Sequence, residues 1–142
     1  MNKYYALAQE FANIFSKDPS RKVGALCVHP ESRVILSQGY NGFPRGIDET
    51  KEERWVRPTK YRWIEHAERN CIYNACRHGV SLEGTTLIVN LFPCADCARA
   101  IIQVGIRTLI TKRPDMDDPV WGSDFKIALE MFQEVGMKIV FI

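Results

Sequence analysis

The sequence indicates an α/β protein, a three-layer α/β/α sandwich with a five-stranded mixed sheet, and two observations support this class. Short β-branched apolar runs alternate with segments of helical periodicity, in the order αββαβαβαβ along the chain. A short turn separates the first two strands, whereas helices separate the later ones, so an antiparallel pair should join a parallel set. Because 142 residues with 46% hydrophobic content suit one core, residues 1–142 are expected to form a single domain.

The first half of the chain should hold one helix, two strands and a loop. Apolar residues at helical spacing predict a helix over residues 3–16, which ends before the Asp18-Pro19 turn. Apolar runs at 24–28 and 33–37, separated by a short polar segment, predict a hairpin. Residues 40–46 contain two glycines and a proline and are expected to form a loop of the kind that approaches ligands.

The second half should alternate helices with strands. Helical periodicity ending at a glycine predicts three helices, at 64–78, 94–104 and 123–135. β-branched apolar runs predict three strands, at 85–91, 107–111 and 137–142. Because each strand-helix-strand connection is normally right-handed, these three strands should be parallel.

Three residues of the metal-ligand type stand out by their spacing. His66 belongs to the segment His66-Ala67-Glu68, and two cysteines belong to Pro93-Cys94-Ala95-Asp96-Cys97. Catalytic zinc takes three protein ligands and leaves its fourth position to water, so His66, Cys94 and Cys97 predict one catalytic Zn²⁺ per chain. Glu68 then remains free to move protons. The two motifs together form the signature of zinc-dependent nucleobase deaminases.

The predicted chemistry follows from where these residues lie. Both ligand groups are expected at helix starts, where the helix dipole favours thiolate over thiol. Zinc lowers the pKa of its bound water from 15.7 toward roughly 7, so hydroxide can attack C4 of a cytosine ring. Glu68 would place one proton on the ring nitrogen and another on the departing amine. The amide of Ala67 could hold the pyrimidine carbonyl oxygen.

A Cys-x-x-Cys motif alone has other interpretations. It could be a thioredoxin-like redox pair, or half of a structural zinc site completed by Cys27, Cys71, Cys76 or His78. A redox pair needs no upstream His-x-Glu, and Cys71 and Cys76 lie deeper in the expected 64–78 helix. We therefore expect Cys27, Cys71 and Cys76 to be small core residues and His78 to lie at the helix end.

Composition excludes some classes of function. A net charge of +2 and a pI near 8.3 are too mild to predict nucleic-acid binding, although they allow a small anionic substrate. The odd number of cysteines and an N-terminus without an apolar signal core indicate the reducing cytoplasm. No apolar stretch approaches the roughly 18 residues that span a bilayer, so membrane insertion is not expected.

Two basic segments are candidates for contact with a phosphate. Arg54, Arg57, Lys60 and Arg62 alternate with Trp55, Tyr61 and Trp63. This stretch could bind a phosphate or stack on bases, or it could be a solvated loop whose aromatic rings pack on the core, and the two interpretations carry equal weight. Arg21 and Lys22, after the Asp18-Pro19 turn, pose the same question.

From Ser16 to about Thr111 the chain resembles the deoxycytidylate (dCMP) deaminases of the cytidine deaminase superfamily. The resemblance lies in three groups of segments: Ser16-Lys17-Asp18-Pro19 with Val23-Gly24-Ala25, then Gly39-Tyr40-Asn41-Gly42-Phe43-Pro44-Arg45-Gly46, then the zinc motifs with Leu91-Phe92-Pro93. It implies a cytidine deaminase-like fold, hydrolysis of dCMP to dUMP and ammonia, and a homo-oligomer between a dimer and a hexamer. It also implies regulation by dCTP and dTTP through the Gly39–Gly42 loop.

The resemblance implies that Asn41 lies in the nucleotide site, and we expect Ala67, Phe92 and Trp121 to contact the substrate with it. Arg21, Lys22 and Arg45 are candidate contacts for a phosphate or an effector. The chain departs from the family in having Cys71 where an alanine is common, and in the segment Arg113 to Gly122. Since that segment can close over the base, Trp121 could shape a pocket for a 5-substituted dCMP.

Two alternative functions remain open at this point. One is another deaminase of the superfamily, acting on a nucleoside, a purine base or transfer RNA adenosine. A transfer RNA editor would need a more basic face and would bind RNA with steep salt dependence. The other is a catalytically silent zinc protein that senses nucleotides, which the presence of Glu68 disfavours.

Overall fold

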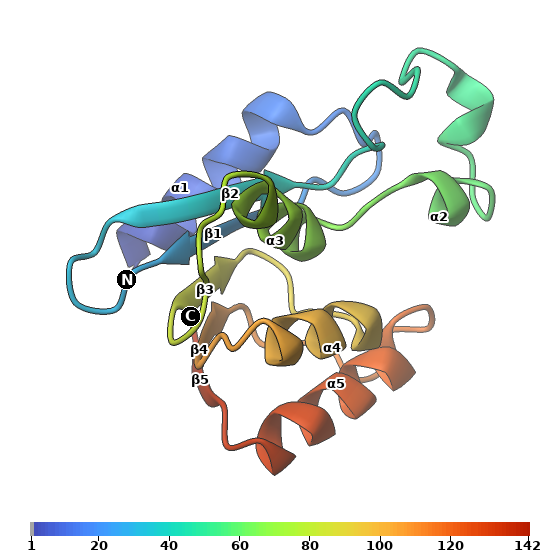
Figure 1. Ribbon diagram of the computed structural model, residues 1–142. Helices are drawn as coiled ribbons and strands as arrows, with labels where there is room; N and C mark the ends of the chain where they lie inside the picture. The colour runs from blue at the N-terminus through green and yellow to red at the C-terminus, as the bar shows by residue number, and fades with distance from the viewer. Residues whose placement is uncertain (1) are drawn as a thin grey trace.

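A five-stranded mixed sheet with strand order β2-β1-β3-β4-β5 forms the centre of the protein, seen in a computed structural model that describes residues 2–142 (Figure 1). The strands are β1 Gly24–Val28, β2 Ile35–Tyr40, β3 Thr86–Val89, β4 Thr108–Thr111 and β5 Lys138–Phe141. β1 pairs antiparallel with both β2 and β3, whereas β3, β4 and β5 are parallel. The expected mixed sheet is therefore confirmed.

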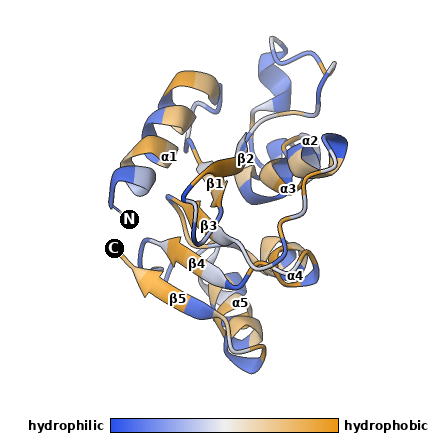
Figure 2. Cartoon of the chain, turned by 60° about the vertical axis from the view of Figure 1, so that its left-hand side comes forward, coloured by the Kyte–Doolittle hydropathy of each residue, from blue (hydrophilic) through white to orange (hydrophobic). Residues whose placement is uncertain are grey.

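Helices cover both faces of this sheet. They are α1 Asn2–Phe15, α2 Lys60–Trp63, α3 Ala67–Arg77, α4 Ala95–Gln103 and α5 Gly122–Glu134. Figure 2 shows α1 on the opposite side of the sheet from α3 and α4. Strand residues alternate between two cores: Leu26 and Ile88 pack with Ala8 of α1, whereas Cys27 and Leu87 pack with α3, α4 and α5. This gives the expected three layers.

Each expected helix and strand is present, with its ends shifted by at most three residues. The largest shift concerns the second strand, expected at 33–37 and found at Ile35–Tyr40. The turn before it is longer than the sequence indicated, because Arg33 adopts a positive φ of 63° and its amide donates to the His29 carbonyl. The His29 amide in turn donates to the Val34 carbonyl, which keeps Val34 outside the strand.

The segment between β2 and α3 leaves the body of the protein and returns, and we call residues 43–64 the excursion. It contains a 3₁₀-helix, Glu52–Arg54, and the short helix α2, neither of which the sequence indicated. Gly42 and Glu65 exchange two backbone hydrogen bonds of 3.1 and 2.8 Å and so close its base. This bridge keeps Glu65 extended, and α3 therefore begins at Ala67 rather than at residue 64.

The cysteines outside the motif are not all in the core. Cys27 and Cys71 are buried as expected, whereas Cys76 is exposed, so that expectation was wrong for Cys76. Cys76 lies on α3 but on the helix face turned to solvent, and its neighbour Ala75 faces the sheet instead. His78 is the C-terminal cap of α3, directly after the last helical residue, Arg77.

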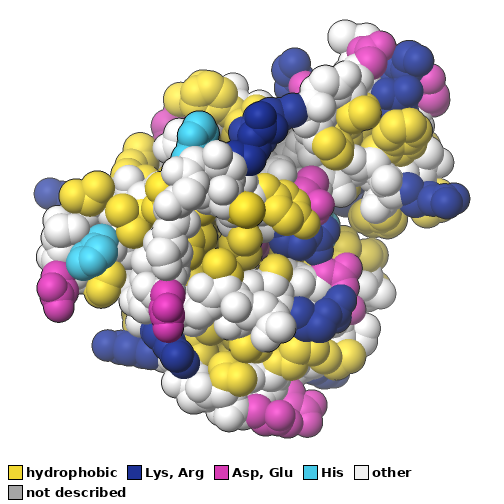
Figure 3. All heavy atoms as spheres, viewed as in Figure 1, with side chains coloured by type: hydrophobic (Ala, Val, Ile, Leu, Met, Phe, Trp, Pro, Cys, Tyr) yellow, Lys and Arg dark blue, Asp and Glu magenta, His cyan; other side chains and the backbone are white. Residues whose placement is uncertain are grey.

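Surface charge is dispersed. On the face drawn in Figure 3, Lys and Arg side chains alternate with Asp and Glu and do not gather into one continuous basic surface. This agrees with the small net charge of +2. Among residues 2–142, no helix has both the length and the apolar character needed to cross a membrane.

Candidate active site

Three side chains converge as the sequence predicted. The ligand atoms of His66, Cys94 and Cys97 all lie within 4.8 Å of one another. The Nδ1 of His66 is 3.4 Å from Cys94 Sγ and 3.5 Å from Cys97 Sγ. One imidazole nitrogen and two thiolate sulfurs form a donor set that suits zinc. Cys27, Cys71, Cys76 and His78 do not belong to this group within the described residues, so no four-ligand structural site is formed there.

Two helix starts bring these ligands together. His66 is the N-terminal cap of α3, and Cys94 is the N-terminal cap of α4, both with extended backbone. Cys97 follows in the first turn of α4. The free amides and positive dipole ends of both helices therefore point toward the sulfurs and favour their ionised form.

The thiols have unequal acidity. Hydrogen bonds from Cys97 and His66 lower the pKa of Cys94 to about 4, although burial alone would raise it. The contact with Cys94, together with burial, raises the pKa of Cys97 well above its usual value. Burial lowers the pKa of His66. Its hydrogen bond to Cys94 and the charge of Glu68 raise this pKa by more than burial lowers it, so the net shift is upward. Cys94 is thus ready to bind a cation, whereas Cys97 must first lose a proton.

Glu68 lies in the first turn of α3 beside this group without belonging to it. Its side chain is buried, with 4% of the residue exposed, and it lines the same pocket as His66 and Cys94. Burial raises the pKa of the Glu68 carboxyl, and the charge of His66 offsets only part of this effect. A carboxyl with a raised pKa near a reacting atom suits proton transfer near neutral pH.

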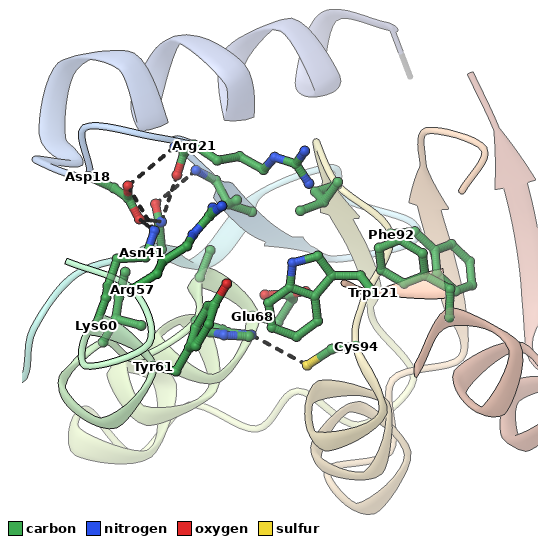
Figure 4. A pocket seen from close by; sticks show the side chains of 16 residues that line it. Asp18, Arg21, Asn41, Arg57, Lys60, Tyr61, Glu68, Phe92, Cys94 and Trp121 are labelled. Atoms are coloured by element: carbon green, nitrogen blue, oxygen red, sulfur yellow. Dashed lines mark hydrogen bonds and ion pairs between the residues drawn. The ribbon is translucent and has the colours of Figure 1, made fainter. Parts of the chain in front are cut away.

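The pocket above these residues spans about 590 Å³, including the open volume at its mouth. Figure 4 shows Glu68 and Cys94 on one side of it and Asp18, Asn41 and Lys60 grouped on the other. The predicted substrate contacts that line it are Asn41, Ala67, Phe92, Trp121 and Arg21.

Asn41 lines the pocket, but its side-chain amide is fully engaged by protein groups. Its Oδ1 accepts hydrogen bonds from Ser16 Oγ and the Val23 amide, both at 2.8 Å. Its Nδ2 donates to Asp18 Oδ2 and to the Arg21 carbonyl, at 3.2 and 2.9 Å. An amide side chain has two donors and two acceptor lone pairs, so these four bonds use its capacity. In this structure Asn41 holds the 16–23 loop in place.

Two other predicted contacts lie outside this pocket. Lys22 donates to the Asn13 carbonyl at 3.2 Å and faces a neighbouring groove. Arg45 hydrogen-bonds Asn74 and lines a second pocket with Tyr73 and Arg77. The structure therefore does not bring these two cations to the zinc ligands.

The excursion supplies a wall of the pocket that the sequence left undecided. Arg57, Lys60 and Tyr61 line it, whereas Arg54 stacks over the Trp63 ring, 4.0 Å from its centroid. Trp55 is stacked on Phe43 at 4.1 Å between ring centroids. Arg54, Trp55 and Trp63 thus pack within the protein, whereas binding of a phosphate by Arg57 or Lys60 stays a prediction. The alternation of basic and aromatic residues was the signal, but it did not say which of them face the site.

Trp121 covers the side of the pocket where the predicted zinc ligand His66 lies. Its ring meets the His66 ring edge-on at 5.9 Å between centroids and the Tyr61 ring at 5.7 Å. Asp118 Oδ1 accepts hydrogen bonds from the amides of Val120 and Trp121, both at 2.8 Å, which fixes the backbone here. A Cβ on Gly122 would lie 2.5 Å from the Met116 carbonyl, so a glycine is required directly after Trp121.

Residues 1–112 match the family model described as the cytidine and deoxycytidylate deaminase zinc-binding region. The chain belongs to this family. Both zinc motifs fall inside the matched residues, so the expected zinc site agrees with the convergence of His66, Cys94 and Cys97. Residues 113–142, with Trp121, lie beyond them.

Relatives of this deaminase family cover most of the chain. It is 33% identical to an "uncharacterized deaminase in luxG 3'region" of Aliivibrio fischeri, over 99% of this chain and 91% of that one. It is 40% identical to the deoxycytidylate deaminase of Pongo abelii, over 85% of this chain and 67% of that one. The chain spans about half the length, 54%, of the mouse and human deoxycytidylate deaminases it matches.

A solved structure has the same fold. The dCMP deaminase of cyanophage S-TIM5, crystallised with dCMP and dUMP, superposes with a TM-score of 0.79 at 24% identity, over 99% of this chain and 95% of that one. The predicted fold and family are therefore confirmed.

Proposed function

We propose that this protein is a zinc-dependent hydrolase that converts dCMP to dUMP and ammonia. One observation carries the proposal: a single pocket is lined by His66 and Cys94 of the predicted zinc group, by the buried Glu68, and by the cations Arg21 and Arg57. A nucleoside monophosphate matches these residues, because its aminated base can face Glu68 and the zinc group while its phosphate faces the arginines. Deoxycytidylate deaminases among the relatives support the same choice.

His66, Cys94 and Cys97 would hold the zinc ion. When bound in such a site, zinc acts as a Lewis acid that makes a water molecule nucleophilic at neutral pH. Glu68 takes a proton from a water molecule while the oxygen of that water adds to C4 of the cytosine ring. Glu68 then delivers this proton to the ring nitrogen. Glu68 then carries the second proton of the water, which is still on the oxygen at C4, to the amine. The C4–N bond breaks, and ammonia leaves while C4 keeps the oxygen. The sum is dCMP and water to dUMP and ammonia.

The base is held by groups around the ligands. The first-turn amides of α3, starting with Ala67, have no partners within the helix and suit the pyrimidine carbonyl oxygen. Phe92 and Trp121 offer aromatic surface on the same side of the pocket. Trp121 lies beyond the residues that match the family model, and we propose that its ring shapes the pocket for a 5-substituted dCMP.

Arg21 and Arg57 are the proposed contacts of the 5′-phosphate. They come from two different loops and both line the pocket. Paired guanidinium groups bind a phosphate dianion well.

The decisive experiment measures ammonia release by the zinc-loaded protein with dCMP, CMP, deoxycytidine and 5-methyl-dCMP. We expect a higher kcat/KM for dCMP or 5-methyl-dCMP than for deoxycytidine, together with one zinc per chain by elemental analysis. Absence of turnover with every cytosine compound would overturn the proposal. Zinc-loaded protein that binds dCMP without turnover would instead identify a silent nucleotide sensor.

We also propose that dCTP or dTTP binds the second pocket as an effector. Arg45 and Arg77 provide positive charge there, and the exposed ring of Tyr73 offers a surface for a base. Calorimetric titration with dCTP in the wild type and in Arg77→Met tests this, with binding expected only in the wild type.

A homo-oligomer and a cytoplasmic location complete the proposal. Five free cysteines suit a reducing compartment. Sedimentation equilibrium, with and without dCTP, would measure the size of the assembly, and a monomer under both conditions would refute the oligomer. Cell fractionation would test the location.

A further inference from the structure

A buried ion pair lies in the wall of the pocket, away from the zinc ligands. Lys60 Nζ is 3.0 Å from Asp18 Oδ2 and 3.2 Å from Asp18 Oδ1, so the ammonium group contacts both carboxylate oxygens. The two side chains are only 5% and 2% exposed. Asp18 belongs to the loop after α1, and Lys60 starts α2 in the excursion. The pair therefore joins two segments that are 42 residues apart in the chain.

The Asp18 carboxylate organises its own loop as well. Its Oδ1 accepts hydrogen bonds from the amides of Ser20 and Arg21, at 2.8 and 3.3 Å. Its Oδ2 accepts the bond from Asn41 Nδ2 at 3.2 Å. One buried carboxylate thus fixes the backbone of Arg21 and, through Lys60, the start of α2.

Lys60 stands between two other residues that face the pocket. Arg57 precedes it by three positions and Tyr61 follows it, and all three line the pocket. The Lys60 amide donates to the Val56 carbonyl at 2.9 Å, and the Ile64 amide donates to the Lys60 carbonyl at 3.0 Å. These two bonds couple the backbone of residues 56–64 to the position of Lys60. Figure 4 shows Arg57 next to the group of Asp18, Asn41 and Lys60.

Much of the rest of the excursion packs on itself, although Glu49 also pairs with the largely exposed Lys17 of the 16–23 loop, at 2.8 Å between Oε2 and Nζ. Phe43 stacks on Trp55, Trp55 Nε1 donates to the Glu49 carbonyl, and Arg54 lies over Trp63. In Figure 1 the excursion projects from the rest of the protein, with α2 near its outer side. A buried ion pair is a poor source of net stability compared with an apolar pair of the same size, but it defines one geometry because both partners must meet.

We propose that Asp18 and Lys60 are positioning residues, whose ion pair holds the excursion and the 16–23 loop together so that Arg57 and Arg21 face the phosphate of the nucleotide. This inference rests on the proposed function, because it assumes a nucleotide substrate. Neither residue touches the reacting atoms. Loss of the pair should therefore weaken binding of the phosphorylated substrate and leave the chemical step unchanged.

The test compares dCMP with deoxycytidine in Lys60→Met, Asp18→Asn, the double variant and Lys60→Arg. In Lys60→Met we expect the KM for dCMP to rise about tenfold or more, with kcat within about threefold of the wild type. The kcat/KM for deoxycytidine, which has no phosphate, should stay within about twofold. The double variant should resemble the single variants because all lack the same pair. Lys60→Arg should recover part of the loss, and Lys51→Met, an exposed lysine of the same excursion, is the matched control.

A second measurement does not depend on activity. Amide hydrogen exchange of residues 57–63 should become about tenfold faster in Lys60→Met, while exchange of α3 and β3 stays unchanged. Unchanged exchange at 57–63, or a KM for dCMP within twofold of the wild type, would overturn the inference. Equal losses with dCMP and deoxycytidine would show a general structural role and would also overturn it. If the wild type deaminates no cytosine compound, the proposed function fails while the exchange measurement still reports whether the pair holds the excursion.

Discussion

Replacement of Glu68 by glutamine tests the proposed chemistry most directly. Glutamine has nearly the same shape as glutamate, but its amide cannot take up a proton and pass it on. Glu68 is 4% exposed, so no bulk water is available to replace it at this position. A positioned general acid and base contributes about 10²–10⁴-fold to the rate, so kcat should fall by that factor, which corresponds to about 3–5 kcal/mol of barrier.

The assay is steady-state ammonia release from dCMP, with zinc content measured on the same preparation. Because Glu68 is not in the His66, Cys94 and Cys97 group, the variant should keep one zinc per chain and a KM close to that of the wild type. Glu134→Gln is the matched control, because Glu134 is an exposed glutamate at the end of α5 and does not line the catalytic pocket. A Glu68→Gln variant that retains more than a tenth of kcat, or that loses its zinc, would refute the reasoning.

Four further predictions follow from the site. Arg57→Met should reduce the preference for dCMP over deoxycytidine about tenfold or more, because a charged hydrogen bond to the phosphate is lost, and an unchanged ratio of kcat/KM values would contradict this. Trp121→Ala should lower kcat/KM for 5-methyl-dCMP more than for dCMP, since the ring beside His66 that is proposed to shape the pocket for a 5-substituted base is lost; equal losses would argue against a role in base selection. At pH 7, zinc binding should release at least one proton per site, because the pKa of Cys97 is raised while Cys94, at about 4, is already ionised. Affinity for zinc should therefore rise with pH. Calorimetry in buffers of different ionisation enthalpy measures the protons released, and a value of zero would contradict the prediction. Gly39→Ala should lower Tm by roughly 3–10 °C, because the added Cβ would lie 2.3 Å from the Ala67 carbonyl, and a thermal melt within 1 °C of the wild type would disprove the tight contact.

The zinc centre could be predicted from sequence because its geometry is local. Cys94 and Cys97 are three residues apart at the start of α4, and His66 and Glu68 are two residues apart at the start of α3, so each pair is kept close by the chain itself. Glycines at the helix ends and β-branched runs in the strands gave the order of elements for the same reason. Only the packing of α3 beside α4 was needed to complete the group.

The sequence named Arg21 and the basic stretch with Arg57 only as candidates, because which of these cations face the pocket depends on contacts between distant segments. The Gly42–Glu65 bridge sets where the excursion begins and ends, and the Asp18–Lys60 pair sets which of its residues turn inward. Neither contact leaves a periodic pattern in the sequence. The positive φ of Arg33, which lengthens the turn before β2, is also invisible to hydrophobic periodicity.

The two sides of the pocket also differ in how firmly the fold holds them. The helix α3 lies against β2 through a row of side-chain to backbone hydrogen bonds: Ser37 Oγ donates to the Cys71 carbonyl at 2.7 Å, and Asn70 Nδ2 donates to the Tyr40 carbonyl at 2.8 Å. Gly39 allows this close approach. His66 and Glu68 therefore belong to a rigid unit, as precise chemistry requires. The proposed phosphate contacts Arg21 and Arg57 lie outside this unit, as does the proposed base contact Trp121, so a change of substrate choice at these residues would leave the zinc centre intact.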